Sequence, residues 1–169
     1  SVGSANKLDL LQREGYDAAI VRGKDFAERL EEKLDGRELS LIMECIGGKI
    51  FQIGYDQLAP QGRMVVYGSA RYASPGDRPN YFKLFYQFLT RPKIDPQKMI
   101  ETNKAILGFN LIWLYEKAPL MHQIIEEMSA LQIAKPLVGH TFAFAKLPEA
   151  IRLFRSGKTM GKVVVQVND

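Results

Sequence analysis

Two cationic side chains, Lys7 and Arg22, each follow a short segment that the sequence predicts to be the end of a β-strand. In open parallel sheets a ligand lies beyond the carboxyl ends of the strands, where neighbouring cations could clamp an anionic group. Small polar and basic residues at this place accommodate the 2'-phosphate of NADP, whereas an acidic residue would select NAD. Ser4, Lys7 and Arg22 therefore favour NADP, although both cations could also be ordinary solvated side chains.

Glycine-containing turns follow three further predicted strands and would meet at the same edge of the sheet. Because glycine has no Cβ atom, it lets the backbone approach a ligand closely. The sequence therefore offers a set of ligand contacts after the strands rather than one reactive group. These turns are Cys45-Ile46-Gly47-Gly48, Tyr67-Gly68-Ser69-Ala70 and Phe109-Asn110-Leu111.

The other chemically capable side chains fit catalysis or metal binding poorly. Cys45, the single cysteine, ends an apolar strand with no histidine near it in sequence, which favours packing over a reactive thiol. His122 and His140 are isolated in a predicted helix and a predicted strand, and no metal-ligand spacing occurs. Glu44 could act as an acid, but the sequence offers it no partner carboxylate.

The sequence contains no glycine-rich phosphate turn. Gly47 and Gly48 followed by Gly54 do not form the dinucleotide fingerprint, whose glycines must open the helix after the first strand. The chain begins instead with Val2-Gly3-Ser4, which reads as the end of a strand running into a helix. We therefore expect the first strand and its turn to be missing from this chain.

Strands alternate with helices in units of about 25 residues, which predicts a parallel sheet with right-handed crossovers. Residues 39–44 are almost uninterruptedly apolar, as in a strand that is covered on both faces. The predicted fold class is α/β, a truncated Rossmann-type, doubly wound, mainly parallel sheet. The expected strands are 17–21, 39–44, 63–68, 105–109, 138–144 and 161–167, and the expected helices are 7–14, 26–34 with Asp25 as cap, 50–58, 81–89, 96–102, 111–115, 119–131 and 146–156.

Three segments depart from this rhythm or stand out within it. Residues 71–80 form a loop rich in proline and glycine. The helix at 81–89 is the most apolar stretch, about half of the roughly 20 residues that cross a bilayer. We expect it to pack on a core, with partner docking or shallow membrane contact as alternatives. In the helix at 146–156, Leu147, Ala150, Ile151 and Phe154 share one face.

Composition sets wide bounds on function. The 169 residues are 46% hydrophobic and 25% charged, ordinary values for one globular domain. The net charge of +4 is spread without a block of like charges, which argues against nucleic acid as a partner. A single cysteine excludes an internal disulfide, and no apolar stretch reaches 18 residues, so we expect a cytoplasmic protein without a transmembrane segment.

In order and spacing, the strand-end motifs resemble the C-terminal half of zinc-independent medium-chain dehydrogenase/reductases, with the quinone oxidoreductases as the nearest branch. The insertion at 70–107 resembles the vesicle amine transport protein group of that branch. The resemblance covers essentially the whole chain. Its motifs are Gly3-Ser4-Ala5 with Lys7 and Gly15, Cys45-Ile46-Gly47-Gly48, Gln61 to Gly68, Gly108-Phe109-Asn110-Leu111, and Gly161-Lys162-Val163-Val164.

The resemblance implies NADPH bound across a Rossmann sheet and hydride transfer to a quinone or an enone. It places Lys7 and Arg22 near the adenosine 2'-phosphate, with Ser4 beside them. Ile46 and Gly47 would lie near the ribose, and Gly68 and Ser69 near the nicotinamide. The segment Phe109, Asn110 and Leu111 would hold the carboxamide.

The resemblance also implies what this chain lacks. Residues 1–169 would form an incomplete nucleotide-binding domain, and the family's N-terminal substrate domain would be absent. We therefore expect no catalysis by this chain alone. The alternative is a non-catalytic dimerisation or interaction module. On either reading, the strand at Ala105 to Phe109 would pair with its twin in a homodimer.

The missing strand should leave a gap. In the Rossmann strand order 3-2-1-4-5-6, the first strand lies between the second and the fourth. It therefore separates residues 17–21 from residues 39–44. We expect that the sheet closes up, that residues 1 to about 35 pack abnormally or are mobile, or that a neighbouring chain supplies the contact. Regular spacing of these strands within one chain would contradict all three expectations.

Overall fold

The computed structural model describes residues 1–73 and 78–167. They form two compact units, one built from residues 1–73 and 81–110 and the other from residues 78–80 and 111–167. Each unit contains a parallel sheet with helices, so the predicted α/β fold class is confirmed. The assignment of residues 1–169 to one incomplete nucleotide-binding domain stays a prediction.

The first unit contains a sheet of three parallel strands in the order β1-β2-β3. In register, Ile42 of β1 lies beside Met64 of β2, and Met64 lies beside Ile106 of β3. A β-bulge interrupts the pairing between Leu39 and Leu41. The strands are β1 (Leu39–Glu44), β2 (Leu58–Val66) and β3 (Ala105–Gly108), so β2 begins earlier than predicted.

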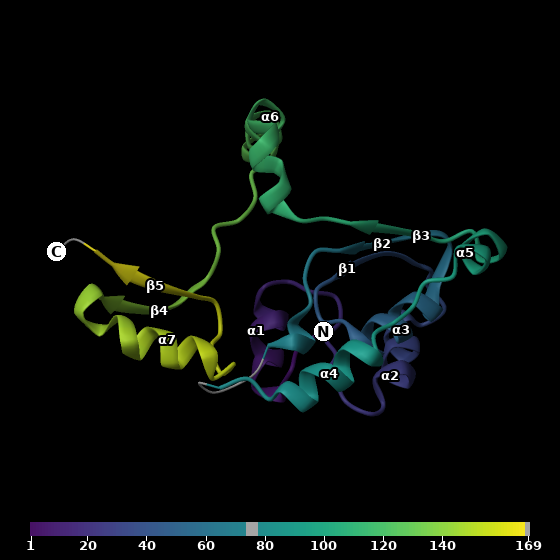
Figure 1. Ribbon diagram of the computed structural model, residues 1–169, viewed down its shortest axis with the longest axis horizontal. Coiled ribbons are helices and arrows are strands. Elements are labelled where there is room, and N and C mark those ends of the chain that lie inside the picture. Colours follow the sequence, from purple (N-terminus) through teal and green to yellow (C-terminus); the bar gives the residue numbers. More distant parts are fainter. Residues whose placement is uncertain (74–77, 168–169) are drawn as a thin grey trace. The chain divides into compact units, whose positions relative to one another are not determined.

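The core of this unit lies between the sheet and helix α3 (Gly48–Gln57). Phe51 and Tyr55 on α3 pack with Leu58 and Met64 on β2, and Met64 is 0% exposed. Helix α2 (Phe26–Leu34) lies on the same side of the sheet as α3 (Figure 1). The hydrophobic effect therefore holds one face of the sheet onto these helices.

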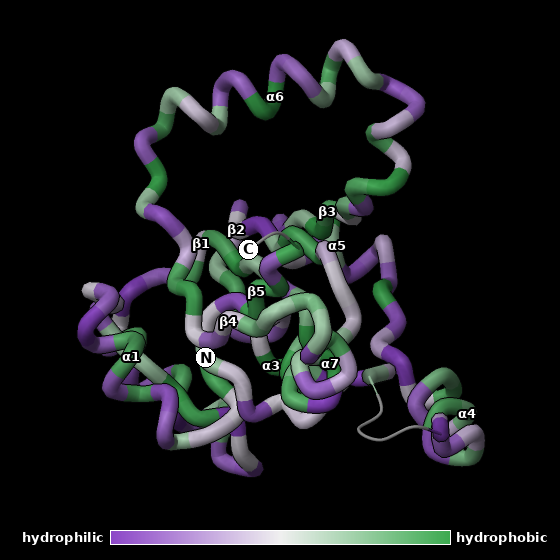
Figure 2. Tube along the Cα trace, turned by 90° about the vertical axis from the view of Figure 1, so that its left-hand side faces the viewer, coloured by the Kyte–Doolittle hydropathy of each residue, from purple (hydrophilic) through white to green (hydrophobic). Residues whose placement is uncertain are grey.

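Within the first unit the opposite face of the sheet is exposed, so the predicted cover of β1 on both faces is not supplied by this unit alone. Figure 2, coloured by hydropathy, shows that β1 is mostly hydrophobic. Leu41 is 58% exposed and Met43 is 60% exposed. Met43 lies in register with Val65 and Leu107, and Leu107 is 47% exposed. These apolar residues of β1 and β3 therefore form an exposed surface of the first unit.

The N-terminal segment contributes one β-bridge rather than a strand. Val2 bridges Val21 in the parallel sense: the Val2 N–H donates to Ile20 O and the Arg22 N–H donates to Val2 O, both at 2.9 Å. The predicted strand at 17–21 was therefore wrong, because one bridge is too short to form a ladder. A 3₁₀ turn (Ala5–Lys7) and helix α1 (Leu8–Arg13) lie between the two segments.

The sheet has not closed over the expected gap. In the described part of the chain, β1 pairs only with β2, and no bridge joins it to Val2 or Val21. Closure of the sheet is thus excluded in this structure. The other two expectations, abnormal packing or mobility of residues 1 to about 35 and a contact from a neighbouring chain, stay predictions.

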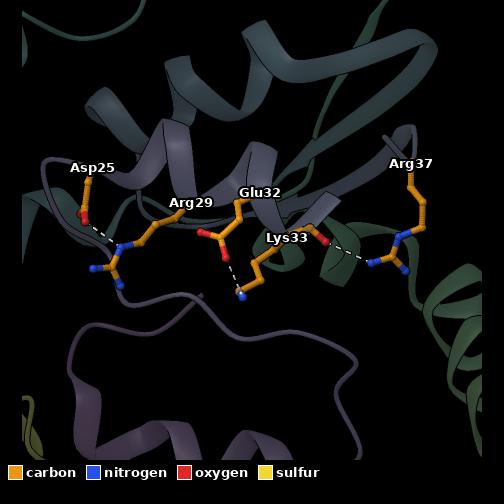
Figure 3. A network of polar contacts seen from close by, with 5 residues as sticks. All are labelled: Asp25, Arg29, Glu32, Lys33 and Arg37. Atoms are coloured by element: carbon orange, nitrogen blue, oxygen red, sulfur yellow. Dashed lines mark hydrogen bonds and ion pairs between the residues drawn. The ribbon is translucent and has the colours of Figure 1, made fainter. Parts of the chain in front are cut away.

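Helix α2 begins after Asp25, but Asp25 makes no side-chain capping hydrogen bond. Its carboxylate instead pairs with Arg29 Nε at 2.6 Å, and this contact lowers the pKa of Asp25 (Figure 3). Lys33 Nζ pairs with Glu32 at 3.1 Å, and Arg37 Nη2 donates to Lys33 O at 3.0 Å. These groups are exposed, and such pairs contribute little to stability.

Helices α4 (Tyr81–Leu89) and α5 (Pro96–Thr102) have the predicted bounds. Asp95 caps α5 by accepting a hydrogen bond from the Gln97 N–H at 3.0 Å. The expectation that α4 packs on a core was wrong, because Phe82 is 90% exposed and Tyr81 is 75% exposed. Of the predicted loop at 71–80, the start belongs to a 3₁₀ turn (Ala70–Tyr72), and residues 74–77 lie outside the described residues.

The second unit is built around two parallel strands. Helix α7 packs on both strands, with Ala150 buried, whereas Ile151 and Phe154 of its predicted apolar face are exposed. Within the described residues, no helix is long and apolar enough to cross a membrane. The elements are a 3₁₀ segment (Leu111–Lys117), α6 (Ala118–Ala130), β4 (Val138–Ala143), a 3₁₀ turn (Phe144–Lys146), α7 (Leu147–Arg155) and β5 (Lys162–Gln166).

Candidate functional site

The carboxyl ends of β1, β2 and β3 meet at one edge of the first unit's sheet. The Tyr67 N–H donates to Glu44 O at 3.0 Å, and the Phe109 N–H donates to Val66 O at 2.9 Å. These bonds extend the ladder by one residue beyond each strand. The turns that follow β1 and β2 and the residue that follows β3 therefore lie side by side, as the parallel topology predicts.

Glu44 organises the turn after β1. The residue is 4% exposed, and its Oε1 accepts hydrogen bonds from the backbone N–H groups of Ile46 at 2.9 Å and Gly47 at 2.8 Å. Its Oε2 is buried and has no hydrogen-bond partner among the described residues. Buried carboxylate oxygens are normally paired, so this atom marks a place where a donor belongs.

Gly47 adopts a backbone conformation that only glycine tolerates. Its φ of 82° and ψ of −176° lie in the region that is essentially restricted to glycine. A Cβ atom on Gly47 would lie 3.1 Å from Arg71 Cδ and 3.3 Å from Ser69 Oγ. The turn after β1 thus presses against the turn after β2, and its backbone is open to close approach.

The two turns are also joined through Cys45. A Cβ atom on Gly68 would lie 3.1 Å from Cys45 Cβ, and the Ala70 N–H donates to Cys45 O at 2.7 Å. The pKa of Tyr67 is raised, first by its side-chain hydrogen bond with Cys45, then by burial and by the charges that Cys45 and Glu44 can carry. The structure therefore brings Ile46, Gly47, Gly68 and Ser69 together, as predicted from sequence.

Arg22 lies at the end of the Val2–Val21 bridge. Its guanidinium Nη1 donates to Ser1 O at 2.9 Å, and a Cβ atom on Gly3 would lie 3.2 Å from Nη2. Ser4 directly follows Gly3, and its hydroxyl donates to Asn6 Oδ1 at 2.6 Å. Lys7 ends the adjoining 3₁₀ turn. Arg22 is therefore placed beside the Gly3-Ser4 backbone.

A cavity of about 370 Å³ connects the two regions, and we call it the β1 groove. Arg22 and Ile46 both line it, so predicted contacts from the two regions share one hollow. Glu44, Cys45 and Tyr67 line it as well. A pocket at strand ends with a few convergent polar groups is the usual form of a ligand site.

The predicted cofactor-binding segment Phe109-Asn110-Leu111 divides between the two units. Phe109 follows β3 beside Val66 and is 48% exposed, and Asn110 comes next in the first unit. Leu111 begins the 3₁₀ segment of the second unit. Phe109 therefore lies at the same sheet edge as the turns after β1 and β2.

Two contributors to the site were not recognised in the sequence. Glu44 serves as a backbone cap, a role that its spacing of two and three residues from Ile46 and Gly47 could have suggested. Arg71 lies against Gly47 and Gly48 and is fixed by Gln87, whose Nε2 donates to Arg71 O at 2.7 Å. Only the fold brings α4 close enough for this contact, so no local sequence signal exists for it.

The described residues do not form a metal site. No group of three or more histidine, cysteine, aspartate or glutamate side chains is placed to hold an ion within residues 1–73 and 78–167. Zinc sites are built from such clusters.

The parallel sheet and the glycine turns at its carboxyl edge define a Rossmann-type α/β protein. Residues 15–165 match the family described as zinc-binding dehydrogenases. Since this match spans most of the chain, the protein belongs to that family. The zinc in the family's description has no counterpart in the donor set of the described residues.

Known relatives are similar along nearly the whole chain. The synaptic vesicle membrane protein VAT-1 homolog of Rattus norvegicus is 25% identical over 166 residues, which are 96% of this chain and 41% of the relative. The quinone oxidoreductase from Thermus thermophilus, whose structure includes its complex with NADPH, is 26% identical with a TM-score of 0.70, over 98% of this chain and 48% of that one. The human VAT-1 homolog-like protein has a TM-score of 0.69 at 18% identity, over 99% of this chain and 44% of that one. The chain thus spans less than half the length of the relatives it matches.

Proposed function

We propose that this chain is the C-terminal, NADPH-binding part of an oxidoreductase that transfers hydride to a quinone or an enone. Two observations carry the proposal: Arg22 and Ile46 line the β1 groove together, and the turns after β1 and β2 pack against each other at the same sheet edge. The similarity to a quinone oxidoreductase known in complex with NADPH supports the same cofactor. The domain containing the substrate pocket would precede Ser1 in a longer polypeptide.

The residues present fit a dinucleotide phosphate. Gly47 leaves its backbone open to close approach, and Arg22 offers a guanidinium beside the Gly3-Ser4 backbone. Arg22, Ser4 and Lys7 would hold the 2'-phosphate by charge and hydrogen bonding. Ile46 and Gly47 would contact the ribose, and Gly68 and Ser69 the nicotinamide side. Phe109, Asn110 and Leu111 would orient the carboxamide.

NADPH supplies the hydride when it is bound, so the reaction requires no nucleophile or metal from this chain. The protein's role is to bind, orient and shield the cofactor. Glu44 holds the Ile46-Gly47 turn in place through two backbone hydrogen bonds. Its contribution is therefore positional.

The direct test is titration of NADPH against this chain and against the longer polypeptide, followed by cofactor fluorescence. We expect saturable binding by the longer form and weaker binding by the chain alone, which has no glycine-rich phosphate turn. Absence of NADPH binding by the longer form would refute the proposal. Tight binding by the chain alone would show that the phosphate turn matters less than we propose.

Replacing Arg22 with alanine should reduce NADPH affinity of the longer form about 10-fold or more, because a charge-assisted contact to phosphate is lost. NADH affinity should change little, since NADH lacks the 2'-phosphate. Isothermal titration with both cofactors measures the ratio. Arg13→Ala is the matched control, because Arg13 lies exposed on α1, where its Nε donates to Asp9 O within the same helix. Equal losses for NADPH and NADH would contradict the assignment of Arg22.

A second candidate function is dimerisation through β3. It would apply if the chain is a non-catalytic interaction module, and it would apply equally to the complete enzyme. β3 ends the strand order β1-β2-β3, so one of its edges is unpaired among the described residues. Such an edge can pair with its twin across a two-fold axis. The Phe109 N–H points to β2, so the neighbouring Gly108 N–H points to the open edge.

Gly108→Pro should convert the dimer to a monomer, because proline removes the outward N–H. Gly108→Ala is the control, since a Cβ atom there meets nothing within 4 Å and the N–H is kept. Light scattering during size-exclusion chromatography gives the mass of each form. A dimer that survives Gly108→Pro would place the interface elsewhere.

We also propose a cytoplasmic location for the protein, which agrees with its single cysteine. Cell fractionation would test this location.

A further inference from the structure

Arg71 packs closely on the turn after β1 without lining the β1 groove. Its Cδ atom lies 3.1 Å from the position of a Cβ atom on Gly47, and its Nη1 atom lies 3.1 Å from that of a Cβ atom on Gly48. Arg71 therefore takes the space that a larger residue at either position would need. The two glycines give the turn its positive φ angles of 82° and 63°, and they also admit the Arg71 side chain.

The main chain of Arg71 joins the same turn to helix α4. Its N–H donates to Ile46 O at 2.9 Å, and its carbonyl oxygen accepts a hydrogen bond from Gln87 Nε2 at 2.7 Å. Gln87 lies on α4, 16 residues further along the chain. Arg71 is therefore tied on one side to the turn after β1 and on the other side to α4.

The guanidinium of Arg71 makes a second connection to α4. Nη2 donates to Thr90 Oγ1 at 3.2 Å, and Nη1 donates to Thr90 O at a longer 3.5 Å. The Thr90 hydroxyl itself donates to Tyr86 O at 2.8 Å, so its lone pairs remain available to Arg71. A cation is also favoured beside the carboxyl end of a helix. Thr90 thus anchors the guanidinium from the end of α4.

We propose that Arg71 is a positioning residue that clamps the Ile46-Gly47-Gly48 turn to α4, and that the affinity of the proposed NADPH site depends on this clamp. Ile46 and Gly47 are the residues proposed to contact the ribose, so their backbone must be in place when the cofactor binds. Without the clamp, binding would also have to order the turn, and the affinity would fall. Arg71 acts through the turn and touches no cofactor atom. This inference rests on the proposed function, but the contacts of the clamp are present in the chain without a cofactor.

Glu44 and Arg71 hold the turn at different atoms, which provides a reporter of the clamp. The Ile46 and Gly47 N–H groups donate to Glu44 Oε1, whereas Arg71 binds Ile46 O and covers Gly48. Loss of Arg71 should therefore loosen the turn rather than unfold it. The hydrogen-exchange rates of the Ile46 and Gly47 amides report how often the turn opens.

Arg71→Met keeps an unbranched side chain but removes the guanidinium. In the 169-residue chain it should raise the exchange rates of the Ile46 and Gly47 amides about 10-fold relative to those of β2. Thr90→Val should raise them about 3-fold or more, because it removes only the anchoring hydroxyl. The comparison with β2 separates a loosened turn from a general loss of stability. Unchanged relative rates would overturn the proposal.

Each variant has a matched control at a helix end. Arg91 also lies at the end of α4, where it donates to Phe88 O at 2.8 Å, so Arg91→Met removes a guanidinium that does not hold the turn. Thr102 ends α5, and its hydroxyl donates to Lys98 O at 2.6 Å, as that of Thr90 does to its own helix. Arg91→Met and Thr102→Val should leave the exchange of the turn unchanged. Equal effects of the variants and their controls would contradict a specific clamp.

Cofactor titration of the longer form gives the second readout. Arg71→Met should lower the affinities for NADPH and NADH by the same factor, about 5-fold or more, because the ribose turn serves both cofactors. Arg22→Ala, in contrast, should affect NADPH alone. Adding Thr90→Val to Arg71→Met should cause no further loss, because both changes remove one contact. Additive losses would overturn the proposal.

Chemical rescue distinguishes positioning by the guanidinium from a general structural role. A cavity of about 350 Å³ adjoins the clamp and is lined by Gly48, Arg71 and Thr90, which leaves room for a free guanidinium ion. For Arg71→Ala, added guanidinium should restore most of the NADPH affinity of the longer form, whereas urea at the same concentration should not. Equal effects of guanidinium and urea would overturn the proposal.

The two readouts separate failure of this inference from failure of the proposed function. Faster exchange of the turn with unchanged cofactor affinity would overturn the proposed role of Arg71 at the cofactor site. If the unsubstituted longer form binds no NADPH, the proposed function fails. The exchange rates in the 169-residue chain then decide alone whether Arg71 clamps the turn.

Discussion

Met64→Ala should lower the free energy of unfolding of the first unit by about 2–5 kcal/mol. Met64 is 0% exposed and lies at the centre of the cluster formed with Phe51, Tyr55 and Leu58. Removing its side chain leaves a cavity between β2 and α3 that the strands and helix can only partly close. Amide hydrogen exchange of β2 measures the change within this unit.

Met43→Ala is the matched control for this substitution. It removes the same side chain from the neighbouring strand, but Met43 is 60% exposed on the uncovered face of the sheet. Its effect should stay within about 0.5 kcal/mol, as is usual for surface positions. Trp113 lies in the second unit, so its fluorescence should report no change for either variant. Equal destabilisation by both variants would mean that the core lies elsewhere.

Gly47→Ala should destabilise the first unit by about 1–3 kcal/mol, because alanine is strained at φ 82° and ψ −176°. The new Cβ atom would also press on Arg71 at 3.1 Å, although that flexible side chain can move. The turn would shift away from the groove, so NADPH affinity of the longer form should fall as well. Denaturant unfolding followed by β2 hydrogen exchange, together with a cofactor titration, measures both effects.

Gly108→Ala separates backbone strain from the mere addition of a methyl group. Gly108 also lies at a strand end, but a Cβ atom there meets nothing within 4 Å and its φ is not positive. Its stability and cofactor affinity should therefore remain close to those of the unchanged protein. If Gly47→Ala were equally mild, the turn after β1 would be more adaptable than its geometry indicates.

The strand-end part of the site was predictable from sequence because it depends on parallel topology. Once β1 and β2 are recognised as consecutive parallel strands, the residues after them must meet at one edge, and Gly47 and Ser69 do so. The bounds of α4 and α5 were equally clear, since Pro96 and Asp95 mark the start of α5. These features depend on local signals of turn, cap and periodicity.

The errors arose where burial depends on residues distant in sequence. The apolar β1 indicated cover on both faces and the apolar α4 indicated packing on a core, yet Met43 and Phe82 are exposed in the first unit. Sequence reports that a surface is apolar but not which segment covers it. In the same way, the predicted strand at 17–21 had suitable residues but lacked a second neighbour, so only the Val21 bridge formed. The role of Arg71 depends on contacts that exist only in the folded unit, whereas the Glu44 cap is a local contact within three residues.

The uncovered face of the sheet has a thermodynamic consequence. The heat capacity change of unfolding grows with the apolar area that folding removes from water. Because Leu41, Met43 and Leu107 are about half exposed or more already in the folded chain, unfolding exposes little additional area there. The stability of the first unit on its own should therefore vary less steeply with temperature than that of a unit whose sheet is covered on both faces, with a flatter maximum.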